Sequence, residues 1–306
     1  MMRDKVNKMI STAMALVLVA SMAGCKSGSE TPVEEPSYAQ ATVSFLGPEG
    51  TYTQEACELF FNGEGAYVPY ETVGDAVQAL SEGTTRYAVI PQENTIGGAV
   101  IDYLDVLIAH PEVSVVGEVV LPISQNLLVL PGASLADIKT VYSHKQGIAQ
   151  GREWLSANLP NAEVIEVSST AEGARMVSEA QDPSCAAIAS VGCADVYGLE
   201  VLASGIQNNS NNKTRFYVLS TDAPGPEGGD MMAFIASGKA SDLPSLIERM
   251  DLRGMKLVTI HDRPLKTELG EYHYLIECTG GRFEDYLHVI NEGPFECRYL
   301  GCFVQK

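Results

Sequence analysis

The sequence contains little positive charge for its length. Its 306 residues include 20 lysines and arginines but 39 aspartates and glutamates, which gives a formal net charge of -19. A field of this sign repels phosphate backbones, so we expect no nucleic-acid partner. The same field disfavours a dianionic small substrate at long range. Any anion site in this chain must therefore be a local cluster of hydrogen-bond donors and cations.

Metal-binding and redox spacings are missing as well. Beyond Cys25 the sequence has six cysteines without a C-x-x-C pair, and its five histidines show no metal-type spacing. We therefore predict no metal site. Scattered buried thiols are the favoured interpretation of the cysteines, and one disulfide, such as Cys297 to Cys302, is the alternative.

The apolar run near the start of the chain is too short for a transmembrane helix. Met9 to Ala20 is almost wholly apolar but spans about a dozen residues, fewer than the 18 or more that a membrane helix needs. Three basic residues precede the run and small residues follow it, which predicts a secretory signal over residues 1–24. The triplet Ala23-Gly24-Cys25 resembles the lipobox of bacterial lipoproteins and implies lipidation of Cys25. A plain signal peptide that is cut elsewhere is the alternative.

Residues 25–40 are rich in serine, proline and glutamate, which predicts a flexible tether. Cleavage after residue 24 removes three basic residues and Asp4, leaving 17 basic and 38 acidic residues and a net charge of -21. Two acyl chains on Cys25 would hold the protein at a membrane, since each buried methylene contributes about 0.8 kcal/mol. We therefore expect an extracytoplasmic protein that is lipid-anchored to a bacterial membrane.

The remaining chain shows the pattern of a mixed α/β protein. Hydrophobic residues make up 45% of the sequence and charged residues 19%, which excludes disordered and fibrous classes. From residue 41 to 222, short apolar strands alternate with helical segments, which predicts two α/β lobes with largely parallel sheets. The expected helices are 53–61, 73–82, 147–158 and 170–179; the expected strands are 42–46, 66–70, 87–90, 115–121, 126–130, 140–143, 163–167, 186–189 and 217–219.

A cluster of glycine, proline and acidic residues within Thr221–Asp230 marks a linker, which we place at 223–230. Residues 231–306 then follow the order βαββαβ, with strands at 231–236, 256–261, 271–278 and 296–304 and helices at 243–251 and 283–291. This order predicts a ferredoxin-like domain.

Five segments of the first 220 residues resemble the prephenate dehydratase family in order and spacing. They are FLGPEGTY (45–52), PQENTIGGAV (91–100), VYSHKQGIAQGREWL (141–155), SSTAEGAR (168–175) and YGLEVLASGIQNNSNNKTRF (197–216). The resemblance implies a two-lobed catalytic domain like that of periplasmic binding proteins. It also implies decarboxylating dehydration of prephenate to phenylpyruvate in phenylalanine biosynthesis, without a cofactor, because aromatisation drives the reaction.

The resemblance also assigns residues. Thr214 would hydrogen-bond the departing hydroxyl, although a strand-entry threonine that bonds the local backbone is the alternative. The other predicted catalytic residues are Asn94, Gln150 and Ser143. The predicted substrate-binding residues are Pro48, Glu49, Gly50, Thr51, Thr95, Ser169, Thr170, Arg215 and Phe216.

Several of these residues have a plain structural interpretation too. Ser168 to Thr170 precede a helix with Glu172 in its first turn, which predicts an N-cap, and a helix N-terminus is itself an anion site. Gly47 and Gly50 would let the first loop approach the ligand or would only form a turn. Arg215 either neutralises a substrate carboxylate or pairs with a structural acid.

The segment 231–306 resembles the ACT domain that follows the catalytic region in this family and binds phenylalanine. Its His261-Asp262-Arg263-Pro264 keeps only Arg263 and Pro264 of the family's Glu-Ser-Arg-Pro motif. Asp242 places a charge beside the expected apolar pocket, and an unpaired buried carboxylate is costly. We therefore expect weak or absent phenylalanine feedback at Arg263 and Pro264, and a homodimer assembled through this domain.

The predicted activity is prephenate dehydratase, a hydro-lyase. Arogenate dehydration is a close variant. Because two α/β lobes behind a lipoprotein signal also describe solute-binding proteins, an exported, lipid-anchored binding protein for an aromatic acid is the alternative from another class.

Overall fold

The computed structural model describes residues 37–224 and 229–306. The predicted signal and most of the predicted tether lie outside the described residues, as does part of the predicted linker. Among the described residues, no helix is long and apolar enough to cross a membrane.

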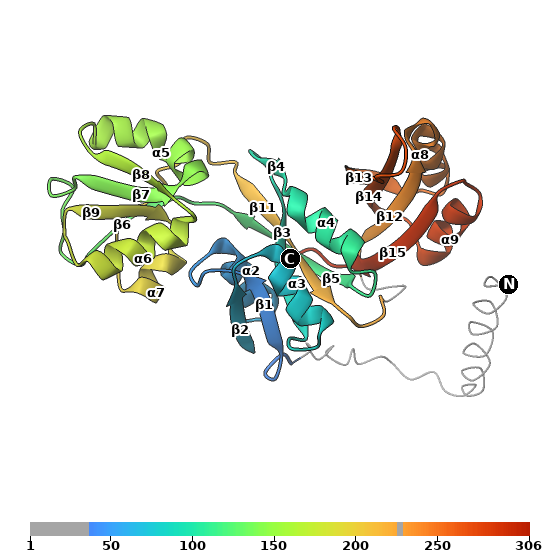
Figure 1. The fold of residues 1–306 in the computed structure, drawn as a ribbon, viewed down its shortest axis with the longest axis horizontal. Helices are drawn as coiled ribbons and strands as arrows, with labels where there is room; N and C mark the ends of the chain where they lie inside the picture. Colours follow the sequence, from blue (N-terminus) through green and yellow to red (C-terminus); the bar gives the residue numbers. More distant parts are fainter. Residues whose placement is uncertain (1–36, 225–228) are drawn as a thin grey trace, which may run out of the picture. The chain divides into compact units, whose positions relative to one another are not determined.

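The first lobe is built on a sheet with the strand order β2-β1-β3-β11-β5, and β4 pairs with β3 (Figure 1). Strand β1 runs parallel to β2 and β3, whereas β11 runs antiparallel to β3 and β5. The prediction of a largely parallel sheet is therefore wrong in this lobe, because β11 returns to its centre from the second lobe. The strands are β1 (Thr42–Leu46), β2 (Ala66–Tyr70), β3 (Tyr87–Asn94), β4 (Gly98–Ala99), β5 (Ser114–Pro122) and β11 (Lys213–Ser220).

Helices cover both faces of this sheet because its central strands are apolar on both sides. In β3, Ala88 and Ile90 pack on one face with α3 and α4, while Val89 packs on the other face with α2. This alternation follows from the two-residue period of a strand. The helices are α2 (Tyr52–Phe60), α3 (Val73–Ser81) and α4 (Ile101–Ala109).

The second lobe has the strand order β10-β6-β9-β7-β8. Figure 1 shows α5 on one face of this sheet and α6 and α7 on the other. Every residue of β9 is buried, as expected of a strand covered on both faces. The elements are β6 (Asn126–Val129), β7 (Thr140–His144), α5 (Lys145–Asn158), β8 (Glu163–Val167), α6 (Thr170–Ala180), β9 (Cys185–Ala189), α7 (Gly192–Tyr197) and β10 (Glu200–Ala203).

The C-terminal domain has the predicted βαββαβ order and an antiparallel sheet arranged β13-β14-β12-β15. With the two lobes, it confirms the predicted fold class. Its elements are β12 (Met231–Lys239), a short 3-10 helix (Ala240–Asp242), α8 (Leu243–Leu252), β13 (Lys256–Pro264), β14 (Glu271–Thr279), α9 (Phe283–Asn291) and β15 (Glu296–Phe303).

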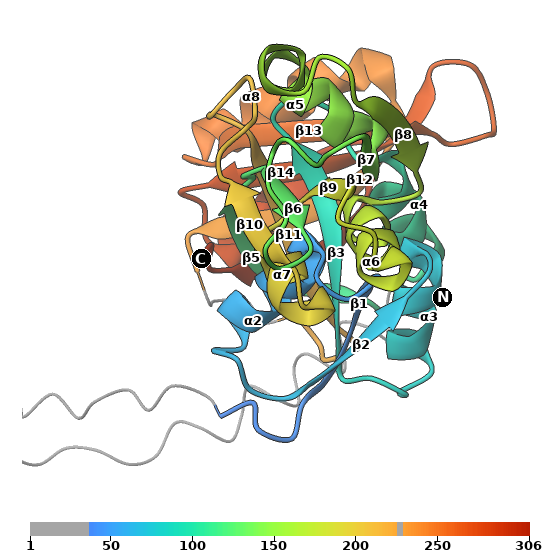
Figure 2. The ribbon, with the colours of Figure 1, turned by 90° about the vertical axis from the view of Figure 1, so that its left-hand side faces the viewer.

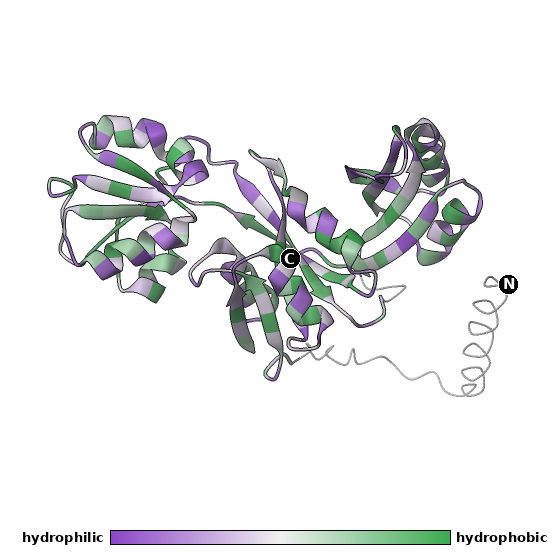
Figure 3. Ribbon diagram, viewed as in Figure 1, coloured by the Kyte–Doolittle hydropathy of each residue, from purple (hydrophilic) through white to green (hydrophobic). Residues whose placement is uncertain are grey.

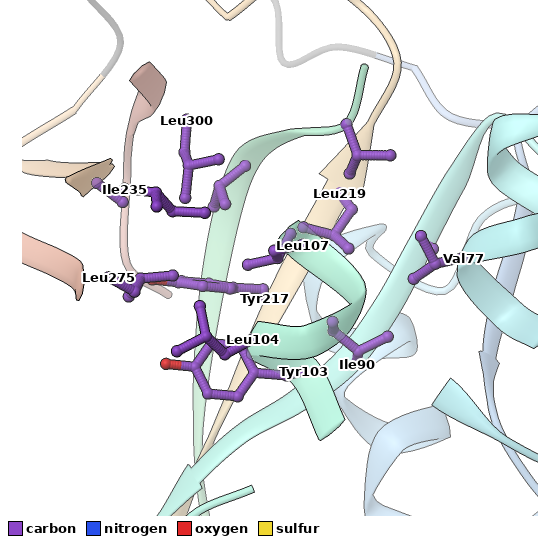
Figure 4. Packing of buried hydrophobic residues seen from close by; sticks show 14 of the residues in the cluster. Val77, Ile90, Tyr103, Leu104, Leu107, Tyr217, Leu219, Ile235, Leu275 and Leu300 are labelled. Carbon is purple, nitrogen blue, oxygen red and sulfur yellow. The ribbon is translucent and has the colours of Figure 1, made fainter. Parts of the chain in front are cut away.

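Both faces of this C-terminal sheet are buried. One face packs against α8 and α9. The other contributes Ile235, Leu275 and Leu300 to the same core as Tyr103 and Tyr217 of the first lobe (Figure 4). The domain therefore packs through a shared core on the first lobe, whose strands β3 and β11 run side by side (Figure 2). Colouring by hydropathy shows the same pattern, with apolar segments along the strands and polar residues on the outer sides of the helices (Figure 3).

Two strands differ from their predicted extents in a way that matters for function. Strand β3 continues past Ile90 to Asn94, and β11 begins at Lys213, before the predicted start at Tyr217. The polar residues of both segments hide the strands from an apolar pattern, but the segments pair with each other. A bulge between Arg215 and Phe216 accommodates Pro91, which cannot donate to the ladder.

The sequence reasoning also missed α4, α7, β4, β10 and the 3-10 helix. The prediction of unpaired thiols is confirmed for the cysteines that the structure describes. Cys57, Cys185, Cys193 and Cys278 are buried and free, and Cys297 and Cys302 are half-buried and free, so the alternative disulfide is not formed.

Candidate active site

A cavity of about 230 Å³ lies where the first and second lobes meet. Its walls carry amides, hydroxyls and one imidazole, and the lining residues include no lysine, arginine, aspartate or glutamate. They are Tyr52, Asn94, Ile123, Gln125, His144, Gln146, Gly147, Gln150, Ser168, Ser169, Thr170, Asn212 and Thr214. The structure thus brings together five of the predicted site residues: Asn94, Gln150, Ser169, Thr170 and Thr214.

The first lobe contributes to the cavity wall a pair of residues on neighbouring strands, Thr214 and Asn94. Thr214 of β11 lies opposite Asn94 of β3 in the antiparallel register. Asn94 Nδ2 donates a hydrogen bond of 2.8 Å to Thr214 Oγ1. The threonine hydroxyl accepts this bond, so its own proton remains available for a group in the cavity.

The orientation of Asn94 is fixed by its second amide atom. Asn94 Oδ1 accepts backbone hydrogen bonds from Ile96 at 2.9 Å and from Gly97 at 3.0 Å. The tight turn after β3 therefore directs Nδ2 towards β11. This is a preorganised arrangement, because the donor needs no reorientation when a ligand binds.

The second lobe contributes amides from two elements. Gln150 projects from α5, and its Oε1 accepts a 3.0 Å hydrogen bond from Gln125 Nε2. Gly147, one turn earlier on α5, lies close to β7, since a Cβ at this position would come within 2.5 Å of Ser143 Oγ. Residue 147 must therefore lack a side chain for α5 to hold this position.

The N-terminus of α6 forms another wall of the cavity. Ser169 Oγ accepts a 3.0 Å hydrogen bond from the backbone N–H of Glu172, which confirms the predicted N-cap. Ser169 and Thr170 also line the cavity, so the cap and the cavity wall coincide. The free amides and dipole of a helix N-terminus favour an anionic ligand group.

The loop between β1 and α2 does not line the central cavity as predicted, whereas Tyr52, the first residue of α2, does. Tyr52 lines the cavity, and its hydroxyl donates to the carbonyl of Ser124 at 2.5 Å. Burial, ahead of the charge of Glu55, raises the pKa of Tyr52 above its ordinary value, so the phenol stays neutral. Pro48 lines an adjoining cavity of about 660 Å³ that shares Ser169.

Glu49, Gly50 and Thr51, which are predicted substrate contacts, do not line the central cavity. Gly50 and Thr51 line a separate hollow beside α7. The carbonyl of Glu49 accepts from Tyr197 Oη at 2.9 Å, and that of Gly50 accepts from Ser190 Oγ at 2.6 Å. The loop is therefore fastened to the second lobe through its backbone.

Ser143, Thr95 and Phe216 are also not among the lining residues. Ser143 is fully buried, and its hydroxyl donates to the carbonyl of Ile188 at 2.7 Å. Phe216 belongs to the hydrophobic core of the first lobe. Thr95 Oγ1 donates to Asn212 Oδ1 at 3.3 Å and so supports a lining residue from behind.

Arg215 lies on the opposite side of β11 from Thr214, because consecutive strand residues alternate. Its guanidinium pairs with Glu118, with Glu277 at 2.7 Å and with Glu93 at 3.2 Å. Of the two interpretations of Arg215, the structure shows the pairing with structural acids, and Arg215 does not line the cavity. Burial works against the charge of Arg215, but its hydrogen bond to Glu118 and the charge of Glu277 raise its pKa above the ordinary value.

In the C-terminal domain, Arg263 makes two hydrogen bonds of 2.6 Å to the carboxylate of Asp105 on α4. These bonds hold the pKa of Asp105 below its ordinary value. Pro264 is exposed at the end of β13. Both predicted effector residues thus lie at the edge of the sheet, and the guanidinium of Arg263 already has a partner.

Sequence reasoning did not assign eight of the lining residues, although a signal existed for some of them. Tyr52 and His144 fall within the segments that carry the family resemblance, and Asn212 stands two residues before Thr214, the spacing that shares one face of a strand. The others are Ile123 and Gln125, together with Gln146, Gly147 and Ser168, which also fall within those segments.

Comparison with known proteins decides the family. A family model described as prephenate dehydratase matches residues 43–224. The chain belongs to the prephenate dehydratase family. It is therefore an enzyme of the hydro-lyase class, as predicted.

Relatives within the prephenate dehydratase family extend the match beyond the catalytic domain. The bifunctional chorismate mutase/prephenate dehydratase of Neisseria gonorrhoeae is 38% identical over 79% of this chain and 67% of its own length. The prephenate dehydratase of Mycobacterium ulcerans is 33% identical over 85% of this chain and 88% of its own. The structure of the Arthrobacter aurescens prephenate dehydratase in complex with L-Phe is 31% identical, covers 86% of this chain and 90% of its own, and superposes with a TM-score of 0.77.

Proposed function

We propose that this chain converts prephenate into phenylpyruvate, carbon dioxide and water in the cavity between its two lobes. The observation that carries the proposal is the hydrogen-bonded pair of Thr214 and Asn94, held on adjacent strands and facing a cavity of neutral donors. Loss of the ring carboxylate as CO₂ and of the C4 hydroxyl as water makes the ring aromatic. The enzyme then has to orient the ring and assist the departing oxygen.

Thr214 assists that oxygen. Because Asn94 Nδ2 donates to Thr214 Oγ1, the threonine proton points away from Asn94 and is available to the C4 oxygen. The N-terminus of α6 with Ser169 and Thr170 supplies donors for a carboxylate. Orientation and hydrogen-bond assistance each contribute about 10²-fold or more, and neither needs a cofactor.

The test compares Thr214→Ala with Thr214→Ser while phenylpyruvate formation is followed. The alanine variant removes the hydroxyl and should lower kcat by about 10²-fold or more, whereas the serine variant keeps the donor and most of the rate. Thr267→Ala, a matched change at an exposed threonine of the C-terminal domain, should leave turnover unchanged. Full activity of Thr214→Ala would refute the role assigned to this hydroxyl.

The lining of the cavity favours prephenate over arogenate. Arogenate carries an ammonium group where prephenate carries a keto group, and a buried ammonium needs a carboxylate partner. The lining residues include no aspartate or glutamate. Parallel assays should therefore give a higher kcat/KM for prephenate, and the reverse order would assign the chain to arogenate.

The βαββαβ domain serves as an ACT domain that binds phenylalanine, with a weaker response than the family motif would give. The likeness to the phenylalanine complex from Arthrobacter aurescens supports binding, whereas the engagement of Arg263 by Asp105 supports the weaker response. Calorimetry with phenylalanine tests this, and Asp105→Asn, which releases Arg263, should tighten binding. Equal affinity of both proteins would remove Arg263 from the effector site.

This domain also forms a homodimer through β13, the outer strand of its sheet. An edge strand presents unpaired backbone groups, and here Leu257 and Val258 are 41% and 49% exposed. Sedimentation should give a dimer for the chain and a monomer for Val258→Lys. A dimer in both would place the interface elsewhere.

The enzyme is exported and anchored at Cys25 by a lipid, on the strength of the residues before and after the lipobox-like triplet. Cys25→Ser should abolish labelling with a radioactive fatty acid and release the protein from membranes. Unlabelled native protein would leave a plain signal peptide. If the protein bound an aromatic acid but did not turn over prephenate, it would be an exported binding protein.

A further inference from the structure

Asn212 lies on the same face of the chain as Thr214. The side chains of residues 211 to 214 are alternately exposed and buried, with Asn211 and Lys213 exposed and Asn212 and Thr214 buried. Asn212 has no exposed surface and lines the cavity. Because side chains two residues apart in a strand share a face, Asn212 and Thr214 present their polar groups to the same ligand.

Within the described residues, the carboxamide of Asn212 has a hydrogen-bond partner at its oxygen but none at its nitrogen. Its Oδ1 accepts at 3.3 Å from Thr95 Oγ1, a hydroxyl shared with the carbonyl of Asn211 at 3.2 Å, and its backbone carbonyl accepts from Ile123 N at 2.9 Å. The bond to Oδ1 fixes which amide atom points away from Thr95, and that atom is Nδ2. Nδ2 is buried and has no hydrogen-bond partner among the described residues.

An unpartnered buried donor destabilises the fold, so its retention calls for a ligand. Five buried side-chain polar atoms lack a partner within the described ranges, and two of them, Asn212 Nδ2 and Gln125 Oε1, belong to residues that line this one cavity. The missing partners therefore concentrate where a substrate would sit, and the Asn212 atom is a donor suited to an anion.

We propose that Asn212 Nδ2 donates a hydrogen bond to the ring carboxylate of prephenate, the group that leaves as carbon dioxide. The inference rests on the proposed function. Two residues of strand rise by about 6.6 Å, which is comparable to the span of a six-membered ring with a substituent at each end. With Thr214 at the C4 oxygen, Asn212 reaches the carboxylate on the opposite ring carbon.

The chemistry explains why a neutral amide occupies this position. The bond from the ring to the carboxylate breaks, its electron pair enters the ring, and the C4–O bond breaks as the oxygen leaves with a proton as water. The carboxylate thus loses its charge during the reaction. A cation would stabilise the charged ground state more than the transition state, whereas an amide orients the group at a smaller cost to the rate.

The experiment measures kcat/KM for prephenate and the inhibition constant of phenylpyruvate, which lacks the ring carboxylate, for Asn212→Ala and Asn212→Asp. A hydrogen bond to a charged group contributes about 1.5–3 kcal/mol, so the alanine variant should lose about 10- to 150-fold in kcat/KM. The aspartate variant keeps Oδ1 for Thr95 but opposes the carboxylate and should lose more. Inhibition by phenylpyruvate should stay unchanged in the alanine variant.

Asn211→Ala is the matched control, since it makes the same neutral truncation at the exposed neighbouring residue and should leave both constants near their native values. If Asn212→Ala does not fold, the isosteric Asn212→Asp carries the test. Retained kcat/KM in a folded Asn212 variant, or an equal loss of prephenate and phenylpyruvate binding, would overturn the inference while the proposed function stands. A native protein that makes no phenylpyruvate would overturn both.

Discussion

Replacing Arg215 by methionine should destabilise the protein strongly, although Arg215 does not touch the cavity. The guanidinium serves three carboxylates, and two of them, Glu118 and Glu277, have fully buried side chains. Breaking a buried ion pair by removing one partner costs about 3–5 kcal/mol. For a chain of this size, roughly 2 °C per kcal/mol converts the loss into a fall in Tm of about 6–10 °C.

The loss should depend on pH in a defined direction. Burial already raises the pKa of Glu118 while Arg215 is present, and Arg215 opposes that rise through a hydrogen bond and its charge. Without Arg215 the native pKa rises further above the unfolded value near 4.5. A carboxyl with a raised native pKa binds more protons when folded, so stability increases as the pH falls through that pKa. The deficit should be largest near about pH 8 and smaller near about pH 5.

Urea unfolding followed by far-UV circular dichroism at both pH values gives the two free energies. Arg263→Met is the control, because its ion pair with Asp105 is partly exposed and an exposed pair contributes about 0.2–1 kcal/mol. A small loss for Arg215→Met, or the same loss at both pH values, would show that the carboxylates are not uncompensated charges and would refute the reasoning.

Three further changes have clear expected outcomes. Ser169→Ala removes the cap of α6, so it should lower the free energy of unfolding by about 0.5–2 kcal/mol and raise KM. Ser169→Asp keeps a capping side chain, so it should restore the stability but not the affinity for substrate. Unfolding curves and steady-state kinetics measure the two effects. Gly50→Ala should lower Tm, because Gly50 has a φ of +81° and a Cβ would lie 3.0 Å from Cys193 Sγ; an unchanged Tm would contradict the tight contact. Burial and the charge of Arg298 hold the pKa of His273 below 6.5. The folded state therefore binds fewer protons at this residue than the unfolded state, and stability is lost as the pH falls below 6.5. The free energy of unfolding of His273→Gln should depend less on pH over that range.

The fold class could be predicted from the sequence because the apolar residues of most elements recur with the period of either a helix or a strand. Val73 to Ser81 and Phe283 to Asn291 are amphipathic segments, and the structure has helices at both. The direction of β11 could not be predicted, because an apolar strand has the same pattern whether its neighbours are parallel or antiparallel. Tertiary pairing with β3 and β5 decides it.

The site was predictable where a residue type and its strand position agree. Thr214 and Asn94 were identified through the family resemblance, and the structure places them in hydrogen-bond contact. Arg215 belongs to the same segment but faces away, since one-residue steps along a strand reverse the face. Phe216 shares the face of Thr214, but it lies further along β11, in the hydrophobic core of the first lobe. A family segment thus marks a strand, and the alternation along it together with the position along the strand decides which residues line the cavity.

Because the protein and its dianionic substrate both carry negative charge, we make one further prediction, on the effect of salt. The formal charge of -19 repels prephenate at long range, and the cavity contains no lysine or arginine to reverse the field locally. Raising the ionic strength from about 0.01 M to 0.15 M shortens the Debye length from about 30 Å to 8 Å. We therefore expect kcat/KM to rise with salt while kcat stays constant, because the groups inside the cavity are not screened.

Two glutamate-to-glutamine variants separate this repulsion from a general effect of salt on the fold. Glu71 lines the cavity that adjoins the active site, whereas Glu284 lies on α9 of the C-terminal domain. Each change removes one negative charge, and a charge near the site acts on the substrate more strongly than a distant one. Glu71→Gln should therefore raise kcat/KM at low salt and flatten its salt dependence, and Glu284→Gln should do neither. A kcat/KM that falls with added salt would mean that attraction dominates the approach, and the neutral-donor description of this site would be wrong.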